Sequence, residues 1–189
     1  MEYAIVVIGA SLGGVKALSL LLSGVRSLGP PVVAVVHRGA DSDDTLIRAL
    51  QSATTVPVRE AVDKQKLEPG TLHVAPANYH LLVEKDGLAL SIEAPVCWAR
   101  PSIDVLFESA ADVWGERVIG IILTGANSDG AQGLARIKRR GGLTVVQQAS
   151  EALCPAMPEA AMAAAPVDRI LPLAGIAEML ADLSREPSR

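Results

Sequence analysis

One serine stands in a turn whose glycines could expose it for nucleophilic chemistry. Ser11 follows a continuous apolar run, Tyr3 to Ile8, and precedes a helical pattern that begins at Gly14. The residues Gly9-Ala10-Ser11-Leu12-Gly13 match the G-x-S-x-G pattern of a nucleophile elbow in the strand-to-helix context that this pattern requires. Two other interpretations stay open: a phosphate-binding loop, although Ser11 stands where a dinucleotide fingerprint has its middle glycine, and a plain tight turn.

A serine hydroxyl becomes a useful nucleophile only when a neighbouring base takes its proton. The chain has three histidines. His37 directly follows the apolar run Val32 to Val36, and the carboxyl ends of parallel strands share the edge of a sheet where ligands bind. We therefore expect His37 to lie near Ser11. His73 falls inside a predicted strand, where we expect a structural role, and His80 follows a loop and is a candidate for lining the pocket.

A third polar segment, Leu123 to Gly130, follows another buried-strand pattern and reaches the same edge. Asp129 in this segment could orient the imidazole of His37 and stabilise its protonated form. Loop amides around Gly125 and Ala126 could bind the oxyanion of a tetrahedral intermediate. The alternative is that Asp129 merely caps the helix that follows it, which is a common role for aspartate.

The elements that must position these residues alternate between buried strands and amphipathic helices. The predicted strands are Tyr3 to Ile8, Val32 to Val36, Thr71 to Ala75, Val118 to Leu123 and Leu143 to Gln147. The predicted helices are Gly14 to Leu22, one capped by Asp43 or Asp44 and ending near Leu50, one capped by Ser102, Ala131 to Arg140, Pro158 to Ala165 and Ile176 to Leu183. Strands separated by helices imply parallel pairing with right-handed crossovers.

Asp86-Gly87, between Leu81 to Lys85 and Leu88 to Ile92, is typical of a hairpin turn. The segment Pro57 to Leu67 stays unassigned. The predicted fold is therefore α/β: a doubly wound, mostly parallel sheet with helices on both faces and an antiparallel hairpin at the edge. We expect one catalytic domain over residues 1–184 and a frayed tail at 185–189.

Composition excludes several classes of function. The chain has 189 residues, of which 50% are apolar and 3% aromatic, and its formal net charge is -4, so a nucleic-acid partner is not expected. The apolar runs are much shorter than the roughly 20 residues of a membrane-spanning helix, which predicts a cytoplasmic protein without membrane insertion. Cys97 and Cys154 lack metal-ligand spacing, so we expect reduced thiols and no zinc.

Further motifs extend along nearly the whole chain. They are Ala10 to Gly14, His37, Pro57 to Ala61, Pro69 to Thr71, Ala75-Pro76 with His80, Arg100 to Phe107, Leu123 to Gly125 with Asp129 to Ala131, and Met157-Pro158. In this order they resemble the catalytic domain of the chemotaxis protein-glutamate methylesterases, the CheB type. The resemblance implies hydrolysis of glutamyl γ-methyl esters on the cytoplasmic helices of methyl-accepting chemoreceptors, with release of methanol and often with deamidation of receptor glutamines.

The resemblance also implies roles for individual residues, and it implies no cofactor. Ser11 becomes the nucleophile, His37 the general base and then acid, and Asp129 the carboxylate that orients His37. An acyl-enzyme route follows from this triad. The expected oxyanion and pocket residues are Ala126, Gly125, Leu12, His80 and Arg100.

The sequence departs from the family pattern at three places. Leu12 stands where members usually have threonine, and Ala126-Asn127-Ser128 lacks the usual methionine and second glycine. The segment Arg38 to Asp44 is acidic where members commonly have a proline-rich, aromatic one. Members also carry an N-terminal receiver domain, whereas this sequence begins at the catalytic domain, so either a separate regulatory protein controls the site or the site is always open.

Two alternatives to a chemoreceptor methylesterase remain. One is a carboxylesterase or amidase of related fold that acts on another substrate. The other, from a different class, is a catalytically silent regulatory binding module that kept the fold. Labelling of Ser11 by a serine-directed fluorophosphonate, dependent on His37, would separate an enzyme from the silent module.

Overall fold

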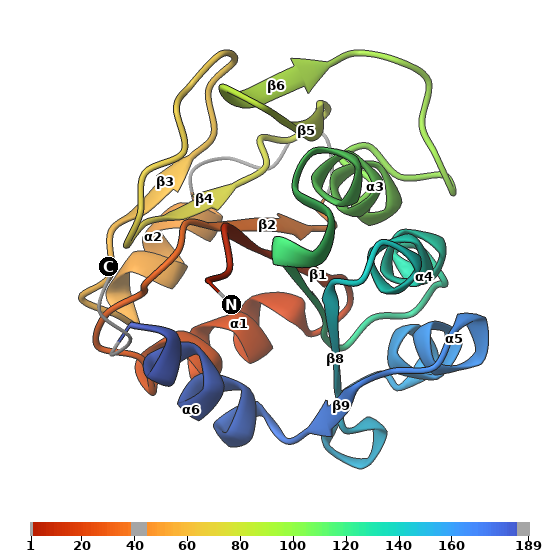
Figure 1. The fold of residues 1–189 in the computed structure, drawn as a ribbon. Coiled ribbons are helices and arrows are strands. Elements are labelled where there is room, and N and C mark those ends of the chain that lie inside the picture. Colours follow the sequence, from red (N-terminus) through yellow and green to blue (C-terminus); the bar gives the residue numbers. More distant parts are fainter. Residues whose placement is uncertain (1, 39–44, 185–189) are drawn as a thin grey trace.

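The computed structural model describes residues 2–38 and 45–184, which form one seven-stranded sheet between two layers of helices (Figure 1). The strand order is β3-β4-β2-β1-β7-β8-β9, and every pairing is parallel. The strands are β1 (Ile5–Ala10), β2 (Val32–Val36), β3 (Val58–Glu60), β4 (Leu72–Val74), β7 (Val118–Ile122), β8 (Leu143–Gln147) and β9 (Arg169–Leu171). The predicted doubly wound α/β fold is confirmed.

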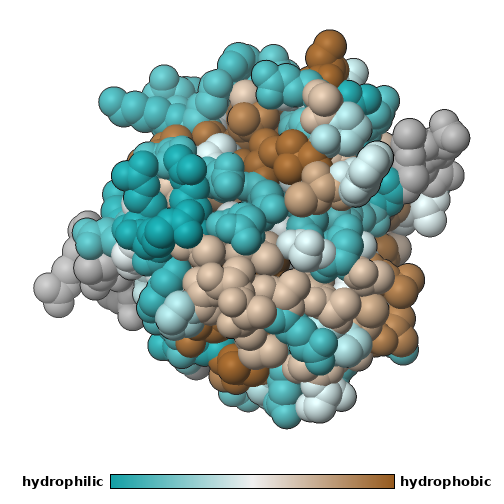
Figure 2. Space-filling view, turned by 90° about the vertical axis from the view of Figure 1, so that its right-hand side faces the viewer, coloured by the Kyte–Doolittle hydropathy of each residue, from teal (hydrophilic) through white to brown (hydrophobic). Residues whose placement is uncertain are grey.

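In the described residues, three helices cover each face of the sheet (Figure 1). One layer consists of α1 (Gly14–Ser23), α2 (Thr45–Ser52) and α6 (Leu173–Leu183). The other consists of α3 (Ile103–Trp114), α4 (Ala131–Arg139) and α5 (Ala156–Ala164). Figure 2 views the molecule from the side of this second layer, where a weakly hydrophobic area lies at the level of the alanine-rich α5.

The central strands are apolar on both faces because helices cover both. In β2, Val32, Ala34 and Val36 belong to the core beneath α1, α2 and α6. Val33 and Val35 alternate with them and belong to the core beneath α3. This explains the continuous apolar runs, since a strand buried on both sides has no solvent-facing positions. β1 ends two residues later than predicted, because Gly9 still pairs with both neighbouring strands and Ala10 still pairs with Val36 of β2.

The predicted hairpin is present as β5 (His80–Glu84) and β6 (Gly87–Ser91). It forms a separate two-stranded sheet rather than an edge of the main one. The reason is that β4 is already paired on both sides, with β2 and with β3, so the hairpin packs against α3 instead. There the N–H of Val83 donates to Ser109 Oγ at 3.0 Å.

The two edge strands, β3 and β9, escaped prediction. β3 lies in the unassigned segment after Pro57, and β9 lies between the last two helices. Each has three residues, too few to show a strand period, and Ile170 of β9 is exposed. Short edge strands of this kind protect a sheet from pairing with another chain.

Several helix boundaries differ from those predicted by one to three residues. α5 begins two residues before Pro158, because proline is tolerated in the first turn, where its missing N–H would have no intrahelical partner. α6 begins at Leu173 rather than Ile176. The predicted cap of α3 is confirmed, since Ser102 Oγ accepts from the N–H of Val105 at 3.5 Å. The predicted caps Asp43 and Asp44 and the tail at 185–189 lie outside the described residues.

None of the helices in the described ranges is both long enough and apolar enough to cross a membrane.

Two glycine-to-alanine substitutions should change stability in opposite directions. A Cβ at Gly9 in β1 would lie 2.3 Å from Ile103 Cγ2, so Gly9→Ala overpacks the core at the start of α3. We expect it to lower the free energy of unfolding by about 1–3 kcal/mol. A Cβ at Gly175 in α6 meets nothing closer than 3.5 Å, so Gly175→Ala should raise it by up to about 1 kcal/mol. Urea unfolding measures both, and equal effects of the two variants would contradict the packing argument.

Candidate active site

Ser11 lies in the tight turn between β1 and α1, at the carboxyl edge of the sheet. Its N–H donates to Thr124 O at 2.9 Å, and its C=O accepts from the N–H of Gly14 at 2.7 Å. Gly13 has φ +81°, a conformation that side chains disfavour, and a Cβ there would lie 2.8 Å from Leu153. The strand-to-helix turn expected from the sequence is therefore what the structure contains.

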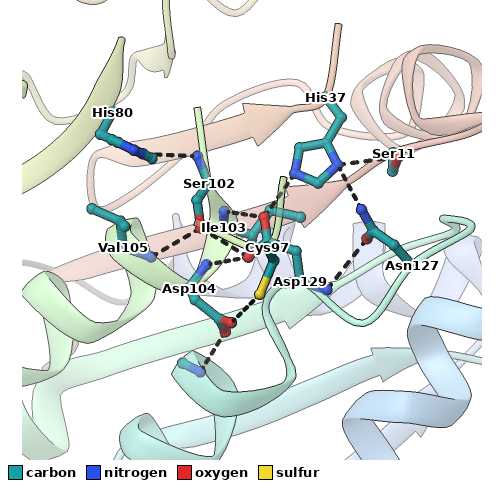
Figure 3. Close-up of polar contacts among 11 residues, drawn as sticks. Ser11, His37, His80, Cys97, Ser102, Ile103, Asp104, Val105, Asn127 and Asp129 are labelled. Atoms are coloured by element: carbon teal, nitrogen blue, oxygen red, sulfur yellow. Dashed lines mark hydrogen bonds and ion pairs between the residues drawn. The ribbon is translucent and has the colours of Figure 1, made fainter. Parts of the chain in front are cut away.

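His37 extends from the end of β2 toward Ser11 (Figure 3). Its backbone N–H donates to Ala10 O at 3.0 Å, which fixes the end of β2 beside the end of β1. The ring atom Nδ1 lies 3.2 Å from Ser11 Oγ, and Nε2 lies 2.7 Å from Asp129 Oδ2. If Nε2 carries the proton and donates to the carboxylate, Nδ1 is free to accept the serine proton.

This arrangement joins hydroxyl, imidazole and carboxylate in one relay. The two ring nitrogens exchange the roles that they have in proteases of the chymotrypsin type, where Nε2 faces the serine. The relay chemistry needs only a base facing the hydroxyl and an acceptor facing the other ring nitrogen, so either order can work.

Asn127 adds a second polar group beside the imidazole. Its Oδ1 accepts from the N–H of Asp129 at 3.3 Å, which fixes the amide orientation, and its Nδ2 lies 3.4 Å from His37 Nδ1 (Figure 3). The amide therefore lies beside the same lone pair that faces Ser11. Asn127 was not among the predicted site residues, because only its place in the loop before Asp129 indicates a role.

Asp129 is fully buried and accepts four hydrogen bonds (Figure 3). Besides His37, the donors are Ser102 Oγ at 2.8 Å, the N–H of Ile103 at 2.7 Å and the N–H of Asp104 at 3.0 Å. The two amides belong to the first turn of α3, where unpaired N–H groups and the helix dipole favour an anion. Asp129 thus binds the N-terminus of α3, not that of the following helix α4, whose cap is Gly130.

The electrostatics keep Asp129 ionised. Burial alone would raise its pKa, but hydrogen bonds from His37, from the amides of Ile103 and Asp104 and from Ser102 outweigh burial, so the pKa lies below its ordinary value. A charged carboxylate facing Nε2 holds the imidazole orientation and stabilises its protonated form.

The amides expected to bind an oxyanion divide into two groups. The N–H of Gly125 donates to Cys154 O at 3.1 Å, so the expectation that it faces the substrate was wrong. That bond and a Thr124 Oγ1 contact tie the loop to the segment before α5. By contrast, the N–H groups of Leu12 and Ala126 have no acceptor within the part of the chain that the structure describes. These two amides remain available for an anionic oxygen next to Ser11.

A pocket of about 560 Å³ opens beside His37. Its lining residues are His37, Arg38, Asn78, Pro95, Cys97, Trp98, Ala99, Arg100, Pro101 and Asn127. Arg100, one of the predicted pocket residues, lines this pocket. His80 does not line this pocket: it is buried, its Nε2 lies 3.1 Å from Ala94 O, and its Nδ1 accepts from the N–H of Ser102 at 3.2 Å. Its polar atoms support the start of α3, because a buried imidazole needs partners for both nitrogens.

His73 is also buried, and the N–H of Glu68 donates to its Nε2 at 3.4 Å. Burial lowers its pKa, so it packs as a neutral side chain far from the relay, in agreement with the structural role expected.

A second buried carboxylate, Asp104, lies behind Asp129. Its Oδ1 accepts from the N–H of Gly133 in the first turn of α4 at 2.7 Å. The N-terminus of α3 is therefore bound by Asp129, which precedes α4, and the N-terminus of α4 is bound by Asp104, which lies in α3. Cys97 completes a group in which the sulfur and carboxylate oxygens lie within 4.8 Å of one another. The oxygens of this group already accept protein donors, so its polar needs are met without an ion.

Replacing Asp104 should change how stability depends on pH. Burial, with the charge of Asp129 adding to it, raises the pKa of Asp104 to about 6. Because the carboxyl pKa is higher in the folded state, the free energy of unfolding falls as the pH rises from about 4 to 6, and it does not recover at higher pH. Asp104→Asn keeps an oxygen for Gly133 and carries no charge. Wild type should therefore lose roughly 1–3 kcal/mol relative to this variant between pH 4 and pH 7.

Asp112 on the same helix is the matched control for this measurement. Hydrogen bonds from Arg136 outweigh other effects and lower its pKa, so its contribution is present above pH 4 and lost as pH falls. Asp112→Asn should thus be destabilising at neutral pH and approach wild type in acid. Urea unfolding at several pH values checks both variants, and parallel pH profiles for Asp104→Asn and wild type would contradict the assignment.

Comparison with known proteins gives a consistent result. A family model described as CheB methylesterase matches residues 6–180. A protein of Leptospira interrogans is 46% identical over 187 residues, which are 98% of this chain and 97% of that protein. Protein-glutamate methylesterase/protein-glutamine glutaminase 5 of Anaeromyxobacter dehalogenans is 38% identical over 96% of this chain, which spans 51% of that protein.

Among solved structures, the Thermotoga maritima CheB methylesterase catalytic domain superposes with a TM-score of 0.92. Its sequence is 28% identical, and the match covers 97% of this chain and 100% of that one. The strand order and the helical layers described above are therefore those of that domain.

Proposed function

Because this chain belongs to the CheB methylesterase family, we propose that it hydrolyses glutamyl γ-methyl esters of a protein substrate through Ser11, His37 and Asp129. The observation that carries the proposal is the unbroken relay from Ser11 Oγ through both ring nitrogens of His37 to Asp129. The proposed substrate is a methyl-accepting chemoreceptor, and the proposed place of action is the cytoplasm, where the esterified receptor helices lie.

The first half of the reaction forms an acyl-enzyme. Ser11 Oγ attacks the ester carbonyl carbon while His37 Nδ1 takes the hydroxyl proton. The negative charge that develops on the carbonyl oxygen is stabilised by the N–H groups of Leu12 and Ala126. The tetrahedral intermediate then breaks its bond to the methoxy oxygen, which receives the proton from Nδ1 and leaves as methanol.

The second half returns the enzyme to its starting state. Water attacks the serine ester, His37 Nδ1 again takes a proton, and the intermediate breaks its bond to Ser11 Oγ, which recovers the proton. The product is a γ-carboxylic acid, which ionises at neutral pH. Asp129 stays ionised in every step and stabilises the imidazolium that forms twice per turnover.

The same steps with ammonia as the leaving group would deamidate a glutamine side chain. The paired names of the relatives, methylesterase and glutaminase, support this second reaction at the same site.

Methanol release from a methylated chemoreceptor fragment tests the proposal. We expect wild type to release methanol and to be labelled at Ser11 by a fluorophosphonate, and His37→Ala to do neither. Faster hydrolysis of a generic carboxylic ester than of the receptor would support an esterase with another substrate. Absence of labelling in wild type would leave the silent binding module.

A further inference from the structure

The turn between Val96 and Ala99, at the rim of the active-site pocket, has an unfavourable backbone for its sequence. Val96 and Ala99 exchange two backbone hydrogen bonds, at 3.1 and 2.9 Å. The two central residues, Cys97 and Trp98, have φ +48° and +63°. A turn with two left-handed central residues favours Asn-Gly, and side chains with a Cβ cost about 1–2 kcal/mol each in this conformation.

Trp98 is also fully exposed. Its indole is the largest apolar side chain that the described residues leave in water, and it lines the same pocket as His37. Tryptophan is rarely left entirely in solvent, and it is enriched where proteins meet partners. A strained turn that holds an indole in water beside the catalytic histidine has no role in the core, so its use must lie in contacts with another molecule.

Arg100 provides a charge behind this indole. Its Nε and Nη2 donate to Asn78 Oδ1 at 3.1 and 2.6 Å, and its Nη1 donates to the C=O groups of Ile92 and Glu93 at 2.8 and 3.0 Å. All of these acceptors are neutral, and in the part of the chain that the structure describes no carboxylate forms an ion pair with Arg100. The other arginine of the pocket, Arg38, is paired with Glu60. The guanidinium of Arg100 is thus rigidly placed and not neutralised.

The other side of Ser11 is apolar. Leu12, Val15 and Leu153 are exposed there, and Leu153 lies against Gly13 in the turn that holds the serine. A polypeptide that brings a side-chain ester to Ser11 therefore meets exposed apolar side chains next to the serine turn.

We propose that Trp98 and Arg100 form a docking element for the protein substrate, in which Trp98 packs on an apolar side chain and Arg100 binds an acidic side chain near the esterified glutamate. This inference rests on the proposed function and specifies which polypeptide the site accepts: an acidic segment with apolar neighbours. The pocket of about 560 Å³ is lined by His37 and Asn127 and also by Trp98 and Arg100, so it offers room for substrate side chains next to the relay. The charge of Arg100 makes an acidic segment the favoured occupant, since a neutral one would leave that charge unpaired.

Two substrates separate docking from catalysis. We compare a methylated chemoreceptor fragment with p-nitrophenyl acetate, a small ester that has no polypeptide for Trp98 or Arg100 to bind. Trp98→Gly removes the indole and suits the left-handed turn, so it should raise the midpoint of urea unfolding. We expect it to lower kcat/KM for the receptor about tenfold or more, mainly through KM, and to leave p-nitrophenyl acetate within about twofold of wild type.

Arg100 is tested by the charge of the substrate. Synthetic peptides carry one glutamate γ-methyl ester flanked by glutamates or by glutamines. Wild type should prefer the acidic peptide about fivefold or more, Arg100→Gln should abolish the preference, and Arg100→Lys should keep part of it. Ile170→Ala and Arg59→Gln, exposed residues on β9 and β3, serve as matched controls and should behave as wild type.

Each result decides the proposal. Equal losses on the receptor and on p-nitrophenyl acetate would mean that the turn only supports the relay, and unchanged receptor kinetics in Trp98→Gly would mean that the indole does not dock; either overturns it. If wild type itself hydrolyses p-nitrophenyl acetate but neither receptor nor peptide, the proposed function fails instead, and the docking proposal fails with it.

Discussion

Ser11→Ala is expected to lower methanol release from a methylated receptor by roughly 10⁴- to 10⁶-fold. In the proposed mechanism the hydroxyl oxygen of Ser11 forms the covalent bond of the acyl-enzyme, and no other group of the site can replace it. The amides of Leu12 and Ala126 remain in the variant, and they account for the residual rate above the uncatalysed one. Fluorophosphonate labelling should disappear together with turnover.

The fold should not suffer from this substitution. Among residues 2–38 and 45–184, the side chain of Ser11 has one polar partner, His37, and the turn itself is held by backbone bonds to Thr124 and Gly14. We expect the free energy of unfolding to stay within about 0.5 kcal/mol of wild type. Ser23→Ala, an exposed serine in the last turn of α1, is the matched control and should retain full activity. Turnover in Ser11→Ala above a hundredth of wild type would refute the nucleophile assignment.

Asp129→Asn should impair both activity and stability. The variant loses the charge that stabilises the imidazolium, and its amide group can hold His37 in the wrong tautomer, so we expect kcat to fall about 10³- to 10⁴-fold. The carboxylate of Asp129 accepts hydrogen bonds from Ser102 Oγ and from two backbone N–H groups in the first turn of α3. In the asparagine variant the side-chain NH₂ group takes the place of one carboxylate oxygen and faces some of these donors. Donor facing donor in a buried site lowers the free energy of unfolding by about 1–3 kcal/mol.

Asp168→Asn provides the control for a lost structural carboxylate. Asp168 accepts from the N–H and Oγ1 of Thr144 at 3.0 and 2.8 Å and pairs with Lys138, at the opposite edge of the sheet from Ser11. Its replacement should lower stability and leave kcat unchanged. Methanol assays and urea unfolding on both variants give the comparison. Equal kcat values for Asp129→Asn and Asp168→Asn would contradict the orienting role of Asp129.

The parts of the site that could be predicted are those fixed by local order along the chain. Ser11 and His37 each follow a strand that is buried on both faces, and parallel strands end at one edge. Neighbouring strands then bring the two side chains together without any further information. The α/β class followed from the same alternation of patterns.

Other expectations failed because they depended on groups distant in the chain. The N–H of Gly125 is used by Cys154, and His80 supports Ser102 rather than the pocket. Neither partner is a sequence neighbour, so no local pattern reveals the contact. The edge strands β3 and β9 were missed for a different reason, since three residues carry too little periodic signal.

The amino-acid sequence alone therefore determined the buried strands, the turn that exposes Ser11 and the edge at which His37 emerges, because these depend on local apolar periodicity and on glycine in one turn. Only the tertiary structure decided what holds Asp129. Its carboxylate lies at the N-terminus of α3, some 26 residues away in the chain, where two helical amides and Ser102 replace water around a buried charge. Sequence separation hides such a contact, since the packing of α3 against α4 is what brings the donors to the acceptor.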